Sequence, residues 1–300
     1  MQEELCRRCF LILMTWIRKI KGVKKINNIS FESKNDKDIL YFTIPIVILI
    51  AICSGIGIWY GKLYLKETVG WLSQCIGQDI SNLFFVAPIL LISAFYASRG
   101  RKIAKIIWIG TMMDNIYSYV IYCYAVHFNF LFHVYCLILG LSIFAVISFF
   151  IKNINEDFRA WFSEKVPTKA IGIFLFIVAF MFCFLWLSDS LPAVLNNRVP
   201  ESIIKDNLFT NPVQALDFSF YLPLMFISSV MLIKKKTLAY LLAPMMIVFA
   251  VLTNVNIISL TVVTMQKTFS NSMPMIIGFS IFTVVCLGFL WLFLKELNTN

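Results

Sequence analysis

Long uncharged apolar runs are the feature that most limits what this chain can fold into. In the stretch Gln214–Lys236, no charged residue lies between Asp217 and Lys234. A helix needs roughly 17–25 apolar residues to cross the hydrocarbon core of a bilayer, so this run is long enough to span it. Eight runs of comparable length follow one another along the chain. They cover residues 39–60, 79–97, 103–125, 129–151, 169–188, 215–233, 237–264 and 273–294.

The runs predict helices rather than barrel strands, because they are about 20 residues long and lack the period-two alternation of a membrane barrel. The composition supports this: 60% of the residues are apolar and 14% are charged, whereas a soluble domain has about 25% charged residues. The predicted fold class is therefore all-α, a polytopic membrane helix bundle with eight transmembrane helices.

The basic residues predict the orientation of the bundle. Of the 26 lysines and arginines, 21 fall in the N-terminal segment or in connections on the same side, and five fall in the remaining connections. Because lysine and arginine accumulate in cytoplasmic loops, both termini are expected in the cytoplasm. The frequent Ile, Lys, Asn and Phe indicate an AT-rich bacterium and its plasma membrane. The net charge of +10 then reflects topology and contact with anionic lipid, and no nucleic-acid partner is expected.

Three regions follow from this topology. Residues 1–38 form a cytoplasmic segment in which the short apolar piece Cys9–Ile17, flanked by arginine and lysine, predicts an interfacial amphipathic helix on the inner leaflet. Residues 39–294 form the transmembrane domain, and residues 295–300 form a cytoplasmic tail. Deletion of residues 1–22 is expected to leave the orientation unchanged.

Known chemical motifs are missing from the sequence. Cys6 and Cys9 form a C-x-x-C without further ligands, whereas a zinc site needs four. His127 and His133 are six residues apart with no carboxylate near them in sequence, which makes them poor metal ligands. No phosphate-binding, metalloprotease, nucleophile-elbow or dinucleotide motif occurs. No metal or cofactor is expected, and a non-enzymatic protein is favoured over an enzyme.

The two halves of the chain show a possible repeat at an offset of 135 residues. This offset places Pro88 on Pro223. It also aligns Asn82 with Asp217, Ser93 with Ser228, Arg99 with Lys234, Arg101 with Lys236, and Ala104 with Ala239. Such an alignment predicts a parallel 4+4 duplication, as some transporter folds have. Chance alignment of apolar helices that contain a proline and end in a basic residue is the alternative.

Polar and acidic residues within the runs are the candidate functional groups, because an intramembrane carboxylate is costly and rarely faces lipid. Asp114 lies near the middle of its run and shares a helical stripe with Thr111, Asn115, Ser118 and Tyr122. With groups from other runs, it predicts a polar, acidic pocket open to the outer face. The pocket residues are Asp79, Asn82, Asp114, Asn115, Ser118, Asp217, Tyr221, Asn254 and Asn256.

A pocket of this kind would suit a cation, a proton relay or an amine-bearing solute. The alternative is that these groups only make interhelical hydrogen bonds. For Asp79 and Asp217 the favoured interpretation is an N-terminal helix cap, a position where the helix dipole stabilises an acid. The aromatic residues near the ends of the runs, among them Tyr117, Tyr122 and Trp186, are expected to form an interfacial belt.

Several short motifs resemble a group of uncharacterised bacterial multi-spanning proteins. They are Asp79 followed by Pro88 and Arg99-Gly100, then Phe128-Asn129, then Trp186-Leu187, and finally Asp217 with Pro223 and a basic end. The resemblance covers roughly residues 78–250. It implies a multi-spanning architecture and brings no activity, cofactor or substrate with it.

Three functional classes remain open on the sequence alone. The first is transport or binding of a small solute or cation through the outward-facing polar pocket. The second is a non-catalytic structural or partner-binding membrane subunit. The third is a membrane enzyme that acts on a lipid-linked substrate.

Overall fold

The computed structural model of this protein describes residues 36–298. The predicted interfacial helix and the Cys6–Cys9 motif lie outside the described residues. Every long element within residues 36–298 is a helix. The helices are α2 (Asp38–Trp59), α3 (Val69–Ser81), η2 (Asn82–Val86), α4 (Ala87–Ser98), α5 (Lys102–Tyr124), α6 (Phe132–Lys152), η3 (Phe158–Trp161), α7 (Thr168–Leu195), α8 (Glu201–Lys205), α9 (Pro212–Leu216), η4 (Asp217–Tyr221), α10 (Leu222–Ile233), α11 (Ala239–Thr268) and α12 (Met273–Leu294).

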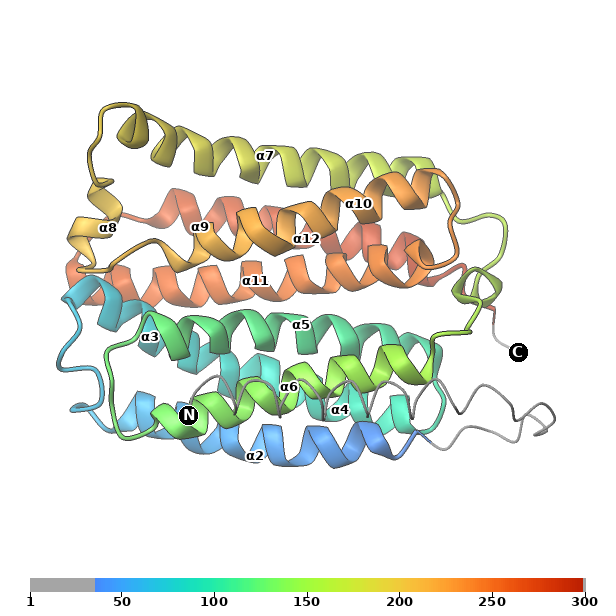
Figure 1. The fold of residues 1–300 in the computed structure, drawn as a ribbon, viewed down its shortest axis with the longest axis horizontal. Helices are drawn as coiled ribbons and strands as arrows, with labels where there is room; N and C mark the ends of the chain where they lie inside the picture. Colours follow the sequence, from blue (N-terminus) through green and yellow to red (C-terminus); the bar gives the residue numbers. More distant parts are fainter. Residues whose placement is uncertain (1–35, 299–300) are drawn as a thin grey trace, which may run out of the picture. The chain divides into compact units, whose positions relative to one another are not determined.

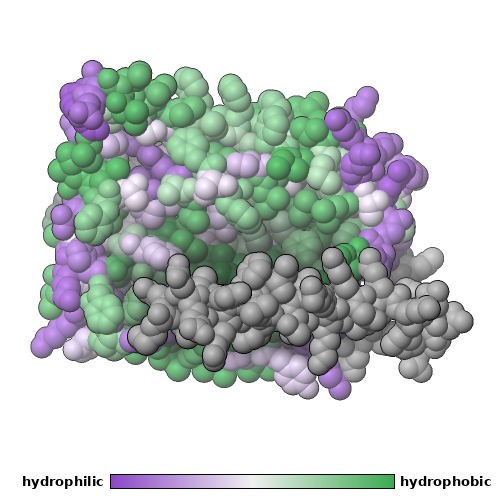
Figure 2. Space-filling view, in the orientation of Figure 1, coloured by the Kyte–Doolittle hydropathy of each residue, from purple (hydrophilic) through white to green (hydrophobic). Residues whose placement is uncertain are grey.

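Seven continuous helices in the described region are long and apolar enough to cross a membrane. Two of them are composite, because α3, η2 and α4 run on without a break, as do α9, η4 and α10. The long helices lie side by side along one axis (Figure 1). Hydrophilic residues gather at the two ends of this axis, and the visible surface between them is mostly hydrophobic (Figure 2). This is the surface of a multi-spanning membrane protein.

Helix α5 is the eighth long helix and is less apolar than the other seven, because it carries Lys102, Lys105 and Asp114. It lies inside the bundle and contacts α4, α6, α9 and α11 (Figure 1). Most of its side chains are buried. Polar groups on α5 therefore face other helices rather than the outer surface, as an intramembrane polar stripe requires.

Connections predicted to share a side do lie at the same end of the bundle. At one end, Lys105 and Lys152 pair with Asp36, which joins the starts of α2 and α5 to the end of α6. At the other end, the backbone N–H and Nδ1 of His127 contact Glu67, which joins the α2–α3 and α5–α6 connections. The first end carries most of the lysines and arginines of residues 36–298 and is called the basic end below.

A one-turn π-helix interrupts each of the two composite helices. In η2 the N–H of Ala87 donates to the carbonyl of Asn82, and in η4 the N–H of Leu222 donates to that of Asp217. Pro88 follows Ala87 directly, and Pro223 follows Leu222. Since proline lacks an N–H and its ring clashes with the carbonyl four residues earlier, the backbone widens at this point. Such π-turns are rare and occur often at functional sites.

The start of the second predicted span is wrong. It was expected to begin at residue 79, but α3 begins at Val69, ten residues earlier. Gln74 and Gln78 make these ten residues less apolar, so the sequence pattern did not identify them as helical. This part of α3 packs closely on the backbone of α11. A Cβ on Gly77 would lie 2.5 Å from Leu260 Cα, so only glycine allows the two helices to come so close.

The long connection 189–214, at the end opposite the basic end, is also more helical than expected. Helix α7 continues to Leu195, and the short helices α8 and α9 follow before the second π-turn. Gln74 of α3 donates to Asp206 in this connection over 3.2 Å. Burial raises the pKa of this Asp206 carboxyl.

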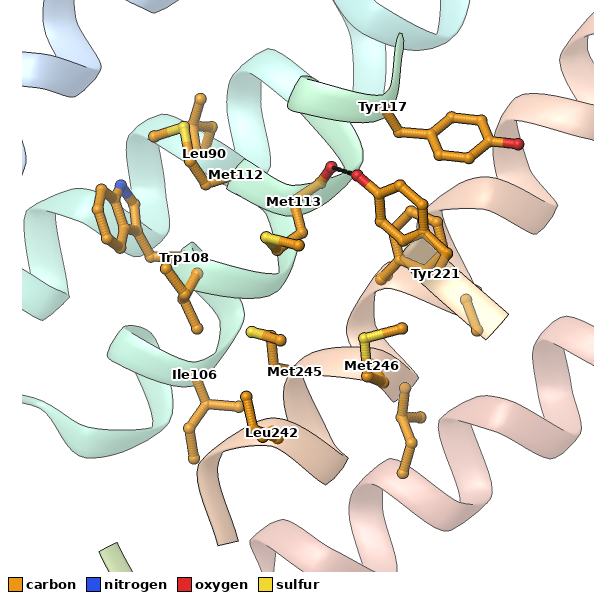
Figure 3. Packing of buried hydrophobic residues seen from close by; sticks show 14 of the residues in the cluster. Leu90, Ile106, Trp108, Met112, Met113, Tyr117, Tyr221, Leu242, Met245 and Met246 are labelled. Atoms are coloured by element: carbon orange, nitrogen blue, oxygen red, sulfur yellow. Dashed lines mark hydrogen bonds between the residues drawn. The ribbon is translucent and has the colours of Figure 1, made fainter. Parts of the chain in front are cut away.

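Helices α5 and α11 pack against each other in the centre of the bundle. Figure 3 shows Trp108 and Met113 of α5, Met245 and Met246 of α11, and Tyr221 beside them. All five are buried. The Tyr221 hydroxyl donates to the Met113 carbonyl over 2.9 Å. This close packing holds α5 rigidly in place, and α5 in turn positions the candidate site.

Candidate functional site

Three buried carboxylates lie on or beside the half of α5 that is farther from the basic end. Asp114 belongs to α5 itself, Asp79 comes from α3, and Asp217 begins the π-turn η4. Asp114 is 0% exposed and Asp79 is 2% exposed. Within residues 36–298, no lysine, arginine or histidine lies within ion-pair distance of any of the three. Burying an unpaired ionised carboxylate costs several kcal/mol or more.

Asp114 lies twelve residues from the start of α5 and ten from its end, which confirms the predicted central position within this helix. The side-chain amide of Asn256 on α11 donates to Asp114 Oδ1 over 3.0 Å and to Oδ2 over 3.2 Å. The Ser81 hydroxyl of α3 donates to the Asn256 Oδ1 atom. Ser81 thereby fixes the orientation of the amide, so that its NH₂ group faces Asp114.

The Thr253 hydroxyl is the second polar group beside Asp114. It lies 2.9 Å from the Phe249 carbonyl and 3.3 Å from Asp114 Oδ1. A hydroxyl has a single hydrogen to donate, and the shorter contact to Phe249 takes it. Thr253 is therefore at most a weak donor to Asp114, and the Asn256 amide is the main donor to this carboxyl. A fully buried acid with so few donors and no basic partner among residues 36–298 is better suited to the neutral form than to the charged form.

Asp79 is held by two tyrosines. Tyr64 donates to its Oδ2 atom and Tyr122 of α5 donates to its Oδ1 atom, each over 2.7 Å. Two further tyrosines of the same cluster, Tyr119 and Tyr135, pack against the Tyr122 ring. The prediction that Asp79 caps a helix is wrong, because the cap of α3 is Thr68 and Asp79 lies inside the helix.

Asp217 is bound in a similar way on the other side of α5. Its Oδ2 atom accepts from the indole N–H of Trp186 on α7 over 2.7 Å, and its Oδ1 atom accepts from the Tyr117 hydroxyl of α5 over 3.2 Å. The cap predicted for Asp217 is also wrong, because Asn211 caps this helix. The π-turn directs the Asp217 side chain into the bundle instead.

Gln78 joins two of the predicted pocket residues. Its side-chain amide donates to Asn82 Oδ1 over 2.9 Å and to the Ser118 hydroxyl of α5 over 3.1 Å. The Nδ2 group of Asn82 is buried and has no acceptor among the described residues. An unpaired buried donor costs about 1–3 kcal/mol, so this position favours binding of a water or another small acceptor.

A small cavity of about 50 Å³ reaches this network. Gln78, Ser118 and Tyr122 line it, together with Trp71 near the start of α3 and Val126 just after the end of α5. A water molecule needs about 10–15 Å³ on this measure, so the cavity has room for more than one water. It is far smaller than the roughly 300–1,000 Å³ of typical organic-ligand sites.

Three predicted pocket residues face elsewhere. Asn115 donates to the Ser142 hydroxyl of α6 over 2.8 Å. The Nδ2 group of Asn254 lies 3.9 Å from the Cys286 sulfur of α12. The Tyr221 hydroxyl donates to the Met113 carbonyl of α5. The nine predicted residues therefore do not line one pocket: adjacent side chains on a helix point to different neighbours, which sequence spacing alone did not resolve.

The sequence predicts an interfacial belt for the aromatic residues that bind the carboxylates. That prediction is wrong for Tyr117, Tyr122 and Trp186, whose polar atoms bind Asp217 or Asp79 inside the bundle. The role of Tyr64 was missed altogether, because it lies in a connection between helices. One general rule could have indicated these contacts in advance: a buried Tyr or Trp side chain usually forms a hydrogen bond with a polar partner.

The histidines do not form a metal site with these acids. His127 lies 2.9 Å from Glu67, a carboxylate that is distant in sequence and was not anticipated. In the described part of the chain, no group of three or more His, Cys, Asp or Glu residues could hold a metal ion.

Comparison with protein-family models, with curated proteins and with solved structures finds no match to this chain. The fold and the site therefore define the protein by themselves. It is a multi-spanning membrane protein whose residues 36–298 are all-helical and place buried acids without basic partners on and beside a central polar helix.

Proposed function

We propose that the protein is an eight-span plasma-membrane protein that takes up and releases a proton at Asp114, reached from the outer face. The observation that carries this proposal is the donor pattern at Asp114: a fully buried acid with no basic partner among residues 36–298, whose neighbouring hydroxyl already donates to a backbone carbonyl. Such a group is neutral as packed and becomes charged only when its environment changes.

The size of the cavity supports a proton over an organic solute. About 50 Å³ beside Gln78 and Ser118 accommodates water but no larger molecule. The cavity does not extend to Asp114, whose carboxyl is held by Asn256, itself bonded by Ser81. A metal or alkali cation is less well suited to Asp114, because the groups that touch the carboxyl are the amide NH₂ of Asn256 and the hydroxyl of Thr253.

The number of spans and the orientation are part of the proposal. The burial of α5 among helices of spanning length supports an eighth crossing, and the division of the basic residues into 21 and five supports cytoplasmic termini. A reporter enzyme fused after Lys236 and another fused within residues 196–211 are expected to report opposite sides. Reporters after Gly100 and after Phe128 should also differ, because α5 separates them. Agreement within either pair would disprove the eight-span arrangement.

Several backbone features support a duplication of four helices. The π-turns η2 and η4 begin 135 residues apart, as do α4 and α10. The same offset relates Gly100 and Lys235, which both have positive φ angles, of 81° and 52°. In each half the residue after this one donates to a carbonyl five residues earlier, a common way to end a helix.

The contacts between the halves follow a two-fold pattern. Helix α3 packs on α11, α9 packs on α5, and α5 and α11 pack on each other. The halves differ at the site: Asp217 binds Trp186 and Tyr117, whereas its counterpart Asn82 binds Gln78. The residue 135 positions after Asp114 is Phe249, so Asp114 has no acidic counterpart in the second half. Duplication of the four helices, followed by divergence of the acidic residues, would therefore leave a single proton site at Asp114.

Infrared difference spectroscopy tests the proton proposal. The full-length protein in liposomes is expected to show a carbonyl stretching band of a protonated carboxylic acid, which disappears when the outer solution is made alkaline. Asp114→Asn should abolish this band, whereas Asn115→Ala, one residue away, should retain it. A band that persists in Asp114→Asn, or that never responds to the outer pH, would instead support a structural subunit.

A further inference from the structure

The basic end of the bundle carries a second feature that the proton site does not use. Between the ends of α4 and α12 lies a pocket of about 670 Å³, lined by Arg99, Arg101, Lys102 and Lys295. No acidic residue of the described chain lines it. The nearest acid in sequence, Glu296, accepts a hydrogen bond from Ser163 instead.

The four cations are unpaired in the described structure. None of them takes part in an ion pair within residues 36–298. Arg99 lies over the Phe95 ring at 3.9 Å and Lys295 over the Trp291 ring at 4.8 Å. Lys102 lies 5.9 Å from the Trp161 ring. Among the described residues no carboxylate pairs with these four cations, so the pocket is electrostatically suited to an anion.

An apolar groove of about 530 Å³ adjoins this pocket along α4 and α5. The two share Tyr96, Arg101 and Ile103, and the groove continues over Ile89 and Ile92. The exposed fraction of Ile92 is 59%, so the groove opens toward the bundle's apolar exterior. A molecule that fills both must have an anionic head and an apolar chain.

We propose that this combined site binds one anionic phospholipid from the leaflet at the basic end. The phosphate group lies among Arg99, Arg101, Lys102 and Lys295, and an acyl chain lies in the groove of α4 and α5. Arginine binds phosphate through two parallel N–H bonds, and basic pockets beside spanning helices bind anionic head groups. The proposal does not depend on proton uptake at Asp114.

The two halves of the chain provide a matched control. Lys234 and Lys236 occupy the positions 135 residues after Arg99 and Arg101, at the same end of the bundle. Between them, Lys235 lies 4.0 Å from Glu164. Replacing Lys234 and Lys236 removes the same charge from the same end but leaves the combined site intact.

Native mass spectrometry of the full-length protein with dioleoyl phosphatidylglycerol or dioleoyl phosphatidylcholine tests the proposal. Wild type should retain one phosphatidylglycerol in preference to phosphatidylcholine. At about 1 kcal/mol for each basic residue near the surface, Arg99→Gln/Arg101→Gln should weaken retention by about thirtyfold. The control Lys234→Gln/Lys236→Gln should stay within about twofold of wild type. Equal losses in both variants would show general surface attraction and overturn the site.

A second arm separates a lipid from a free phosphate. Ile92→Gln leaves every charge in place but makes the groove polar, and it should weaken phosphatidylglycerol retention by severalfold. Glycerol phosphate, which has the head group without the chains, should not displace the lipid. Displacement by glycerol phosphate together with an unaffected Ile92→Gln variant would assign the pocket to a soluble phosphate and contradict the proposal.

Discussion

Replacing Asp114 with asparagine is expected to leave the fold almost intact, whereas replacing it with leucine should destabilise it strongly. An amide has the shape of a protonated carboxyl, so an asparagine side chain at this position can still accept from the Asn256 amide. We expect a loss below about 1 kcal/mol, the size of a typical net hydrogen bond. Leucine leaves the buried Asn256 amide without its acceptor, which costs about 1–3 kcal/mol for that group alone, before any misfit of the side chain.

Thermal unfolding of the two variants in the same detergent measures this difference. The substitution Asn115→Ala is the control, because Asn115 is equally buried but bonds to Ser142 on the other side of α5. It should lower stability to an intermediate degree without affecting the infrared band. If Asp114→Asn were as damaging as Asp114→Leu, the carboxylate would have to be ionised in the fold, and the assignment of a neutral Asp114 would fail.

Gly57→Ala is expected to disrupt the Asp79 cluster from a neighbouring helix. A Cβ on Gly57 of α2 would overlap the Asp79 Oδ2 atom and lie 3.0 Å from the Tyr64 hydroxyl. The carboxylate must move, and it then loses its two short bonds to Tyr64 and Tyr122. Overpacking costs about 1–3 kcal/mol, and hydrogen bonds to a charged group are worth about 1.5–3 kcal/mol. We expect a loss of about 2–4 kcal/mol from these two effects together.

Gly55→Ala is the matched control on the same helix, because its Cβ would meet only the Trp59 ring at an ordinary 3.5 Å. It should change the unfolding temperature little. A double-mutant cycle gives the decisive measurement. In an Asp79→Ala background, Gly57→Ala should cost at least about 1 kcal/mol less than in wild type, because the clashing carboxylate is absent. Additive losses would show that Gly57 acts through backbone entropy and not through Asp79.

Hydrophobicity and charge in the sequence were enough to predict most helices. The predicted spans 39–60, 103–125 and 273–294 agree with α2, α5 and α12 to within one residue at each end. Apolar length alone predicts these helices, because a bilayer core demands it. The prediction failed where polar residues lie inside a helix, as with Gln74 and Gln78 of α3. There the helix is stabilised by its close contact with α11, which no local pattern reveals.

The candidate site was predicted by residue type but not by arrangement. Intramembrane acids are rare enough for Asp114 to be selected directly from the sequence. Its pairing with Asn256, 142 residues away, depends on how α5 crosses α11. The cap predicted for Asp79 followed from a misplaced helix start, and the belt predicted for Trp186 ignored that its N–H faces Asp217.

The sequence by itself determined that this chain forms membrane helices and which end holds the basic residues. These are local properties of apolar length and charge. Only the tertiary structure decided the partners of the three acids: Asn256 for Asp114, tyrosines for Asp79, and Trp186 with Tyr117 for Asp217. The physical reason is that hydrogen bonds inside a bundle depend on the rotation and crossing of neighbouring helices, which close contacts at residues such as Gly77 set to within a fraction of an ångström.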